Sequence, residues 1–266
     1  MSALVATDLD RTLIYSLSAA GHAPNLVPVE RRRDADVSWM TARAAAVYAR
    51  LTAAATVVPV TTRTPEQWQR ITLPGRPPRH VIAANGGVLL VAGRRDAAWD
   101  ATVAARLTEV APLAAVRAHA ERVCRADPGA RLRDACEMFC YAVLDGGLPA
   151  EVLAEAAAAA TAFGWQLSLQ GRKLYWVPRT LTKSAAVTEV ARRVGADRVL
   201  AAGDSLLDAD LLEHADRGVV AQHGELVASG WRAPHVDVTT ARWAAAGEEI
   251  VRWFAAELSA VTSSRG

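Results

Sequence analysis

Short, continuously apolar runs that stop at polar turn residues alternate with longer alanine-rich amphipathic segments along much of this chain. Continuous apolarity suits strands that are buried on both faces, and their alternation with helical segments indicates an α/β fold, a parallel sheet covered by helices. The expected core strands are residues 4–7, 56–60, 81–84, 199–202 and 218–221. The expected helices are residues 37–53, which Ser38 would cap, 65–71, 183–194, 208–215 and 241–258.

The middle of the chain, from about residue 88 to residue 177, has a different pattern. Strands come in adjacent pairs, each pair preceded by a helix, which indicates an antiparallel α+β unit inserted into the parallel core. We therefore expect a discontinuous core of residues 1–86 and 179–266, interrupted by a second domain of residues 87–178. The elements expected in the insert are helix 100–125, strands 131–133 and 138–145, helix 149–163, and strands 166–169 and 173–177.

The composition excludes several classes of protein. The 266 residues are 52% hydrophobic, and 30 Lys and Arg nearly balance 28 Asp and Glu, whereas a nucleic-acid binder would carry a basic surplus. No run reaches the roughly 18 apolar residues of a membrane span, and the start of the chain lacks a secretory signal. The three cysteines have no metal-ligand spacing. We expect a cytoplasmic protein with reduced thiols that binds neither nucleic acid nor membranes.

Two acidic residues follow the first expected strand. Asp8, Asp10 and Thr12 form a D-x-D-x-T pattern at its carboxyl end, where open α/β sheets bind ligands. Residues two apart in an extended chain point the same way, so both carboxylates can face one site, where a cation must compensate their charge. Alone the pattern is weak, because two acids that cap the following turn would look the same.

Three later segments place polar residues at comparable positions. Thr61 ends an apolar run, where it could donate to a phosphate oxygen or cap the next helix. Lys183 starts a helix, where the dipole disfavours a cation unless the cation neutralises a carboxylate or phosphate; an exposed surface lysine is the alternative. Asp204 and Asp208 follow the fourth expected strand, and Asp208 could be only an acid in the first turn of a helix.

In this order the polar groups resemble the four motifs of the haloacid dehalogenase superfamily of phosphohydrolases, which match Asp8/Asp10/Thr12, Thr61, Lys183 and Asp204/Asp208. Residues 83–87, Ala-Ala-Asn-Gly-Gly, are similar to a turn in the branch that carries a large cap between the second and third motifs. That branch includes Cof-type sugar-phosphate phosphatases, sucrose-phosphate phosphatase and phosphomannomutase. The resemblance covers essentially the whole chain and implies a Rossmann-like core with an inserted αββαββ cap of the C2 type.

The resemblance also implies roles for single residues. Asp8 would be the nucleophile that forms an aspartyl-phosphate, and Asp10 would protonate the leaving alcohol and then activate water. Thr61 and Lys183 would hold the phosphoryl oxygens. The residues expected to bind Mg²⁺, which prefers oxygen ligands, are Asp8, Asp10, Asp204 and Asp208, although Asp208 could instead orient Lys183. The residues expected to bind substrate are Thr12, Thr62, Arg63, Asn85 and Gly86.

The chain departs from the usual motifs at three positions, where Arg11, Thr62 and Leu207 replace Gly, Gly and often Asn. None of these changes removes a catalytic group. We therefore expect a Mg²⁺-dependent phosphatase that acts on a small phosphorylated metabolite, such as a sugar phosphate. The alternatives are a phosphotransferase or phosphomutase of the same superfamily, and a silent protein that binds a phosphorylated ligand without turnover. The oligomeric state stays open.

Overall fold

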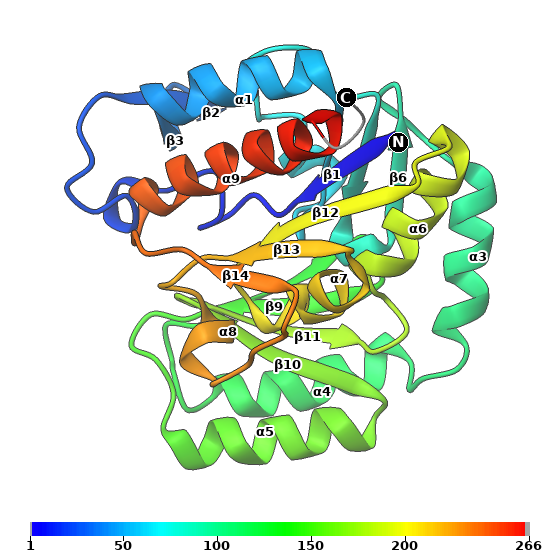
Figure 1. Cartoon of the computed structure of the whole chain (residues 1–266). Helices are drawn as coiled ribbons and strands as arrows, with labels where there is room; N and C mark the ends of the chain where they lie inside the picture. The colour runs from blue at the N-terminus through cyan, green and yellow to red at the C-terminus, as the bar shows by residue number, and fades with distance from the viewer. Residues whose placement is uncertain (1, 264–266) are drawn as a thin grey trace. The chain divides into compact units, whose positions relative to one another are not determined.

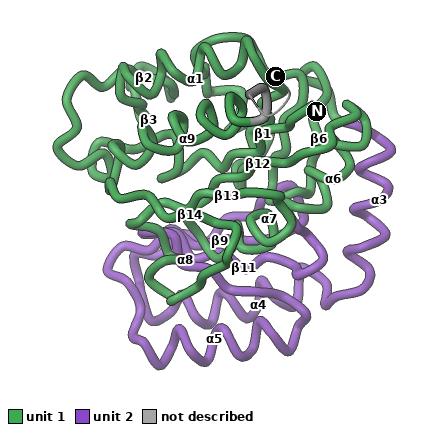
Figure 2. The backbone as a smooth tube through the Cα atoms, viewed as in Figure 1, with its two compact units in different colours: residues 1–95, 183–266 green, residues 96–182 purple. Residues whose placement is uncertain are grey.

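The computed structural model describes residues 2–263 of the chain. These residues form two compact units. Both ends of the chain, up to Arg95 and from Lys183 onward, make the first unit, and residues 96–182 make the second (Figure 2).

The first unit is built around a parallel sheet with the strand order β14-β13-β12-β1-β4. Its strands are β1 (Ala3–Thr7), β4 (Thr56–Pro59), β12 (Arg198–Gly203), β13 (Arg217–Val220) and β14 (Val236–Val238). In the centre, Val5 of β1 pairs with Leu200 on one side and with Val57 on the other. The structure thus confirms the parallel core and four of its five expected strands, and adds β14 at the edge.

Helices pack on the faces of this sheet (Figure 1). Those of the first unit are α1 (Ala42–Ala54), α2 (Pro65–Trp68), α6 (Lys183–Val194), α7 (Ala209–His214), α8 (Glu225–Ala228) and α9 (Ala244–Ser263). α1 and α9 lie side by side, and their Leu51 and Phe254 join Val5 of β1 in one buried cluster. α6 packs against α7, which also contacts β12.

A hairpin of β2 (Leu26–Arg32) and β3 (Ala35–Thr41) precedes α1. The prediction of a helix from residue 37 is therefore wrong at its start, because residues 35–41 pair with β2, and the cross-strand contacts override the helical pattern. Ser38 lies in β3 and is not the N-cap. That role belongs to Thr41, whose Oγ1 accepts a hydrogen bond from the backbone N–H of Ala44 at 3.1 Å.

The expected strand at residues 81–84 forms, but in a different sheet. β5 (His80–Ala83) pairs antiparallel with β6 (Val88–Val91), which pairs with β7 (Arg94–Arg95). A single parallel bridge between Val60 and Ile82 connects this small sheet to the residue that follows β4. The prediction of β5 as a strand of the parallel sheet is therefore wrong, because within the described chain the ladder partner of β5 is β6 and only the bridge at Ile82 joins it to the end of β4.

The second unit is an antiparallel sheet with helices, in the expected αββαββ order except that its first helix is split. Its strands, β8 (Arg131–Ala135), β9 (Phe139–Val143), β10 (Trp165–Gln170) and β11 (Lys173–Pro178), have the order β10-β11-β9-β8. Its helices are α3 (Ala97–Leu107), α4 (Leu113–Cys124) and α5 (Ala150–Ala162). The single helix expected at 100–125 breaks before α4, because Pro112 lacks a backbone N–H and disfavours helical geometry in the residue before it.

Two further expectations concern the whole chain. Cys124, Cys136 and Cys140 are free cysteines. Among the helices that the structure describes, none is both long enough and apolar enough to cross a bilayer.

Candidate active site

Asp8 and Asp10 lie in a tight turn directly after β1. The backbone N–H of Asp8 continues the parallel ladder by donating to the carbonyl of Ala202 at 2.9 Å. The carbonyl of Leu9 then accepts hydrogen bonds from the N–H groups of residues 12, 13 and 14, and Arg11 adopts a left-handed conformation with φ of 63°. This turn ends the strand and leaves the Asp8 side chain at the carboxyl edge of the sheet, where it is only 5% exposed.

Lys183 lies between two of the predicted acids. Its Nζ donates to Asp8 Oδ1 at 2.7 Å and to Asp208 Oδ1 at 2.5 Å, and the lysine is fully buried. Burial by itself would lower the pKa of Lys183, but the charges of Asp208 and Asp8 outweigh it and raise that pKa above its ordinary value. The two carboxylates therefore stabilise a cation at the first residue of α6, where the helix dipole disfavours one.

Burial changes the ionisation of the acids as well. It raises the pKa of Asp8 to about 7, against the opposing charge of Lys183. It also raises the pKa of Asp204 well above its ordinary value, and the neighbouring Asp8 adds to the effect. Negative charge is therefore in excess at this edge of the sheet, which is the condition that a bound cation would relieve.

Asp208 uses both of its carboxylate oxygens within the protein. Oδ1 accepts from Lys183, while Oδ2 accepts from the N–H of Asp204 at 3.1 Å and from the N–H and Oγ of Ser205 at 2.9 and 2.8 Å. Gly203 makes room for this arrangement, because a Cβ on it would lie 2.4 Å from Cβ of Asp208. Of the two roles left open for Asp208, the geometry favours orienting Lys183 and the turn after β12.

The residues present fit a divalent cation. Oxygen atoms of Asp8, Asp204 and Asp208 lie within 4.8 Å of one another, and carboxylate oxygens are the ligands that Mg²⁺ prefers. The side chain of Asp10 is not in this group, because both of its oxygens accept from Arg63, from Nε at 2.7 Å and from Nη2 at 2.8 Å.

Thr61 and its neighbours follow β4 at the same edge. The N–H of Thr61 donates to the carbonyl of Ile82 at 2.8 Å, and its Oγ1 accepts from the N–H of Arg63 at 3.1 Å. Thr61 does not cap the next helix, since Thr64 is the N-cap of α2 and forms a capping box with Gln67. Thr61, Thr62 and Arg63 are all buried.

The other expected substrate-binding residues lie in two turns. Asn85, in the turn after β5, donates its N–H to the carbonyl of Thr61 at 2.9 Å, and is 1% exposed with φ of 55°. Gly86 follows it with φ of 93°. Thr12 is fully buried, and its Oγ1 has no hydrogen-bond partner within the part of the chain that the structure describes. The turn at Asn85 is thus hydrogen-bonded directly to the Thr61 segment.

Two residues that the sequence analysis left out surround Arg11. Arg11 places Nε 3.2 Å from Asp204 Oδ2 and donates from Nη2 to the carbonyl of His223. His223 donates from Nε2 to the carbonyl of Arg11 at 2.9 Å and accepts at Nδ1 from the N–H of Trp243 at 3.0 Å. Burial and the charge of Arg11 lower the pKa of His223 to about 4. Arg11 therefore points at an acid of the site, and no motif around His223 or Trp243 marks them in the sequence.

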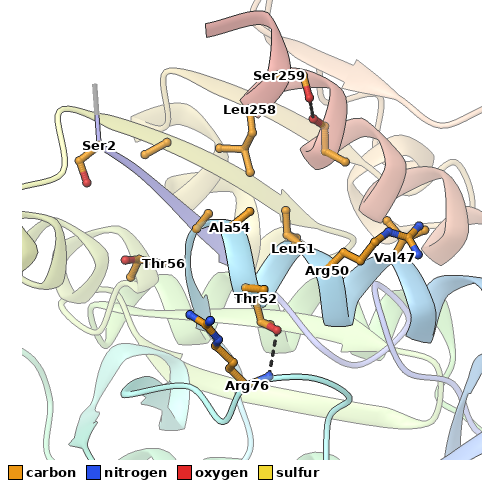
Figure 3. A pocket seen from close by; sticks show the side chains of 14 residues that line it. Ser2, Val47, Arg50, Leu51, Thr52, Ala54, Thr56, Arg76, Leu258 and Ser259 are labelled. Carbon is orange, nitrogen blue, oxygen red and sulfur yellow. Dashed lines mark hydrogen bonds between the residues drawn. The ribbon is translucent and has the colours of Figure 1, made fainter. Parts of the chain in front are cut away.

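A cavity of about 700 Å³ lies in the first unit, away from these residues (Figure 3). Ser2 and Thr56, at the amino ends of β1 and β4, line it together with Thr52 of α1 and Leu258 of α9. Parallel strands have all their amino ends at one edge, so this cavity is at the edge of the sheet opposite to Asp8. None of the candidate catalytic residues is among the described residues that line it.

The sequence matches no family model and no curated protein. Solved structures do match it over nearly its whole length. The sucrose-phosphatase of Synechocystis sp. PCC6803 has a TM-score of 0.66 at 17% identity, with 96% of this chain and 99% of that chain covered. The C-terminal domain of trehalose-6-phosphate phosphatase from C. albicans has a TM-score of 0.57 at 10% identity, with 96% and 93% covered.

A third similar structure is a sugar phosphatase of subclass IIB of the haloacid dehalogenase (HAD) superfamily. Its TM-score is 0.55 at 14% identity, with 90% of this chain and 94% of that chain covered. The three likenesses extend over both units of the chain. The protein therefore has the fold of a haloacid dehalogenase phosphatase, with a second unit inserted into its parallel core.

Proposed function

We propose that this protein is a Mg²⁺-dependent phosphatase that hydrolyses a small phosphorylated metabolite, a sugar phosphate or similar phosphomonoester, through a phosphorylated Asp8. The observation that carries the proposal is the buried ion pair of Asp8 and Lys183 at the carboxyl edge of the sheet, with Asp204 and Asp208 beside it. A buried carboxylate with a displaced pKa and a specific charge partner is typical of a functional site. The fold shared with a sucrose-phosphatase and a sugar phosphatase supports the same reaction.

In the first step a carboxylate oxygen of Asp8 attacks phosphorus. Lys183 holds Oδ1, which leaves Oδ2 to form the new O–P bond while the bond from phosphorus to the leaving oxygen breaks. Asp10, after taking up a proton from solvent, donates it to the leaving oxygen, so that the product departs as an alcohol, and Arg63 stabilises the carboxylate that remains. Lys183 and Thr61 stabilise the negative charge on the phosphoryl oxygens.

In the second step Asp10, now a carboxylate, removes a proton from water. The water oxygen attacks phosphorus, the bond to Asp8 breaks, and inorganic phosphate leaves. Asp10 ends the turnover protonated and ready for the next leaving group, so the protons balance. Its side chain is 30% exposed, so water can reach it, and Arg63 holds the carboxylate form between the two steps.

The residues that would hold Mg²⁺ are Asp8 and Asp204, whereas Asp208, which accepts one donor at Oδ1 and three at Oδ2, would orient Lys183 and the turn after β12. When bound, the ion offsets the repulsion of several kcal/mol between the carboxylate of Asp8 and a phosphate dianion. The guanidinium of Arg11 lies 3.2 Å from Asp204 Oδ2 and would have to share that carboxylate with the metal.

The substrate class rests on the similar structures. The Synechocystis sucrose-phosphatase structure holds sucrose and phosphate, and another similar structure is a sugar phosphatase. We extend this class to the present chain, with the inserted unit of residues 96–182 selecting the leaving group. The product of the reaction would then be a free sugar or a related alcohol.

The test is a phosphate-release screen over sugar phosphates, nucleotides and phosphorylated acids, with Mg²⁺ and with a chelator. We expect release that needs Mg²⁺ and that Asp8→Asn abolishes. The matched control is Asp237→Asn, which removes an exposed acid of β14 and should leave turnover unchanged. After reaction with an aryl phosphate, Asp10→Asn should carry one phosphoryl group by mass spectrometry, because it lacks the base for the second step.

Other outcomes of these experiments would assign the protein a different function or a different nucleophile. Conversion of a sugar 1-phosphate to its 6-phosphate isomer without free phosphate would make the protein a phosphomutase. Saturable binding of phosphorylated ligands without release, unchanged by Asp8→Asn, would make it a silent binding protein. Phosphate release that persists in Asp8→Asn would refute Asp8 as the nucleophile.

A further inference from the structure

Glu30 is a buried acid on the β2–β3 hairpin, outside every motif of the sequence. Its side chain is 4% exposed, whereas its neighbours Arg31 and Arg32 are exposed. The pairing of β2 with β3 shifts on both sides of Glu30, which lies opposite Ser38: Val29 is an extra residue on β2 before this pair, and Val37 is an extra residue on β3 after it. Such a bulge re-aims the side chains of its strand, and here it turns a carboxylate inward.

Backbone hydrogen bonds fix the bulge to the chain that follows α2. Glu30 forms a bridge with Ile71, and the N–H of Thr72 donates to the carbonyl of Val29 at 2.8 Å. The N–H of Arg31 donates to the carbonyl of Arg70 at 3.2 Å. The hairpin is therefore attached to the segment that carries Arg63, and the position of Glu30 does not depend on its side chain alone.

The carboxylate of Glu30 has a full set of partners. Arg63 Nη1 lies 2.8 Å from Oε1, Arg70 Nε lies 3.3 Å from the same oxygen, and Ser38 Oγ donates to Oε2 at 2.5 Å. A buried carboxylate is costly unless it is paired and hydrogen-bonded, and this one is both. The pairing accounts for its burial.

Arg63 connects this acid to the candidate active site. The guanidinium is planar and presents its N–H groups in a fixed fork, so two partners on different edges fix its plane. Glu30 takes Nη1, while Nε and Nη2 donate to the two oxygens of Asp10. Arg63 is 8% exposed and the Asp10 side chain 30%, so a buried arginine holds a carboxylate that reaches solvent.

We propose that Glu30 is a positioning residue for the proton transfer by Asp10, and that it acts through Arg63. The inference rests on the proposed phosphatase function, since it concerns the group that protonates the leaving alcohol. Without the anchor on Nη1, Arg63 can rotate out of the plane in which it meets both Asp10 oxygens. The β2–β3 hairpin thereby supports the proton transfer indirectly, through the contact of Glu30 with Arg63.

The dependence of the rate on the leaving group of the substrate distinguishes this role from a purely structural one. An alkyl phosphate needs a proton on its leaving oxygen, whereas the leaving group of p-nitrophenyl phosphate departs without one. Because kcat/KM covers only the steps up to cleavage of the substrate, the ratio of kcat/KM for the two substrates reports proton donation and not the later attack of water. A general loss of folded protein or of phosphate binding lowers both values and leaves the ratio unchanged.

The experiment compares that ratio in the wild type, Glu30→Gln and Asp10→Asn. General acid catalysis contributes roughly 10² to 10⁴-fold, and Asp10→Asn measures its full value here. For Glu30→Gln, which keeps the shape of the side chain, we expect the alkyl to aryl ratio to fall by about tenfold, in the direction of Asp10→Asn. The matched control is Glu257→Gln, which breaks an ion pair with Arg198 at the amino end of β12 and should keep the ratio.

Ser38→Ala is a milder second variant, in case Glu30→Gln folds poorly. It removes the hydrogen bond to Oε2 and keeps every charge, so the ratio should move in the same direction by a smaller factor. Unchanged ratios in both variants, with an active wild type and a lowered ratio in Asp10→Asn, would overturn the role of Glu30 and leave the phosphatase intact. A wild type that releases phosphate from neither substrate would instead overturn both proposals.

Discussion

Replacing Lys183 by Met tests the charge arrangement of the site most directly. Methionine has nearly the length of lysine and fills the fully buried position without the charge. The change leaves the carboxylates of Asp8 and Asp208 without the cation that lies 2.7 and 2.5 Å from them. Asp208 keeps three donors, from Asp204 and Ser205, so most of the loss is expected to come from Asp8.

The magnitude follows from the burial of these groups. Removing one partner of a buried ion pair costs about 3–5 kcal/mol, because it leaves an uncompensated charge. Asp8 has a pKa of about 7 even beside Lys183, so it escapes part of this cost by taking up a proton. A carboxyl group whose pKa is raised in the folded state stabilises the protein at low pH and loses that effect as pH rises through the folded value. The loss in Lys183→Met should therefore approach about 3 kcal/mol at pH 8 and be smaller at pH 5.5.

Urea unfolding followed by tryptophan fluorescence measures the effect, with a chelator present so that no metal replaces the lysine. Lys173→Met is the matched control, since Lys173 is the chain's only other lysine and lies on β11 of the second unit. A free energy of unfolding equal to that of the wild type at pH 8, or a loss of the same size at both pH values, would refute the reasoning. Adding Asp208→Asn to Lys183→Met should recover part of the loss.

Three further predictions concern the surroundings of this pair. Gly203→Ala should lower the free energy of unfolding by about 1–3 kcal/mol in urea melts, because its Cβ would lie 2.4 Å from Cβ of Asp208. The matched control is Gly146→Ala, because Gly146 also lacks a positive φ and a Cβ on it would lie 4.0 Å from Asp127 Oδ1. His223 accepts from the N–H of Trp243 and has a pKa lowered to about 4, so on acidification its imidazole takes up a proton in the unfolded chain before it does so in the folded one. As pH falls from about 6.5 to about 4, the free energy of unfolding of the wild type should therefore fall by up to about 3 kcal/mol relative to that of His223→Gln. Parallel plots of this free energy against pH for the two proteins would contradict the prediction. Arg11→Gly places a glycine at a position with positive φ and removes the guanidinium from Asp204. Calorimetric titration should therefore find that the variant binds Mg²⁺ more tightly than the wild type does. Equal or weaker binding would contradict the competition between Arg11 and the ion.

The strands of the parallel core could be predicted because their burial on both faces leaves a continuous apolar run in the sequence. The candidate residues were predictable for a related reason, since polar groups that directly follow such strands collect at one edge of the sheet. Asp8, Thr61 and Asp204 all do so. The meeting of Lys183 with Asp8 is a contact over 175 residues, and its position at the start of a helix was the only local sign of it.

The β2–β3 hairpin shows why the rest could not be predicted. Pro28 and the exposed arginines around residue 32 look like a loop, and the inward direction of Glu30 depends on a bulge that only the pairing with β3 creates. The break before α4 was visible as Pro112, but the helical pattern on both sides of it concealed the stop.

The composition also distinguishes Lys183 from the other basic residues. The chain has 28 arginines and only two lysines, one of which is Lys183. A chain that otherwise uses arginine keeps a lysine where a compact, fully buried ammonium group meets two carboxylates.

The order of the strands also determines when the chain can fold. β1 pairs with β4, which follows it by roughly fifty residues, but its other neighbour is β12, nearly two hundred residues later. During synthesis, one edge of β1 therefore stays unpaired while residues 96–182 are being made. Those residues can form their own sheet from local strand pairings. Asp8 gains the cation that offsets its burial only when Lys183 and β12 arrive. Completion of the site and closure of the core are therefore one late event, and a chain truncated before β12 should remain exposed to aggregation and proteolysis.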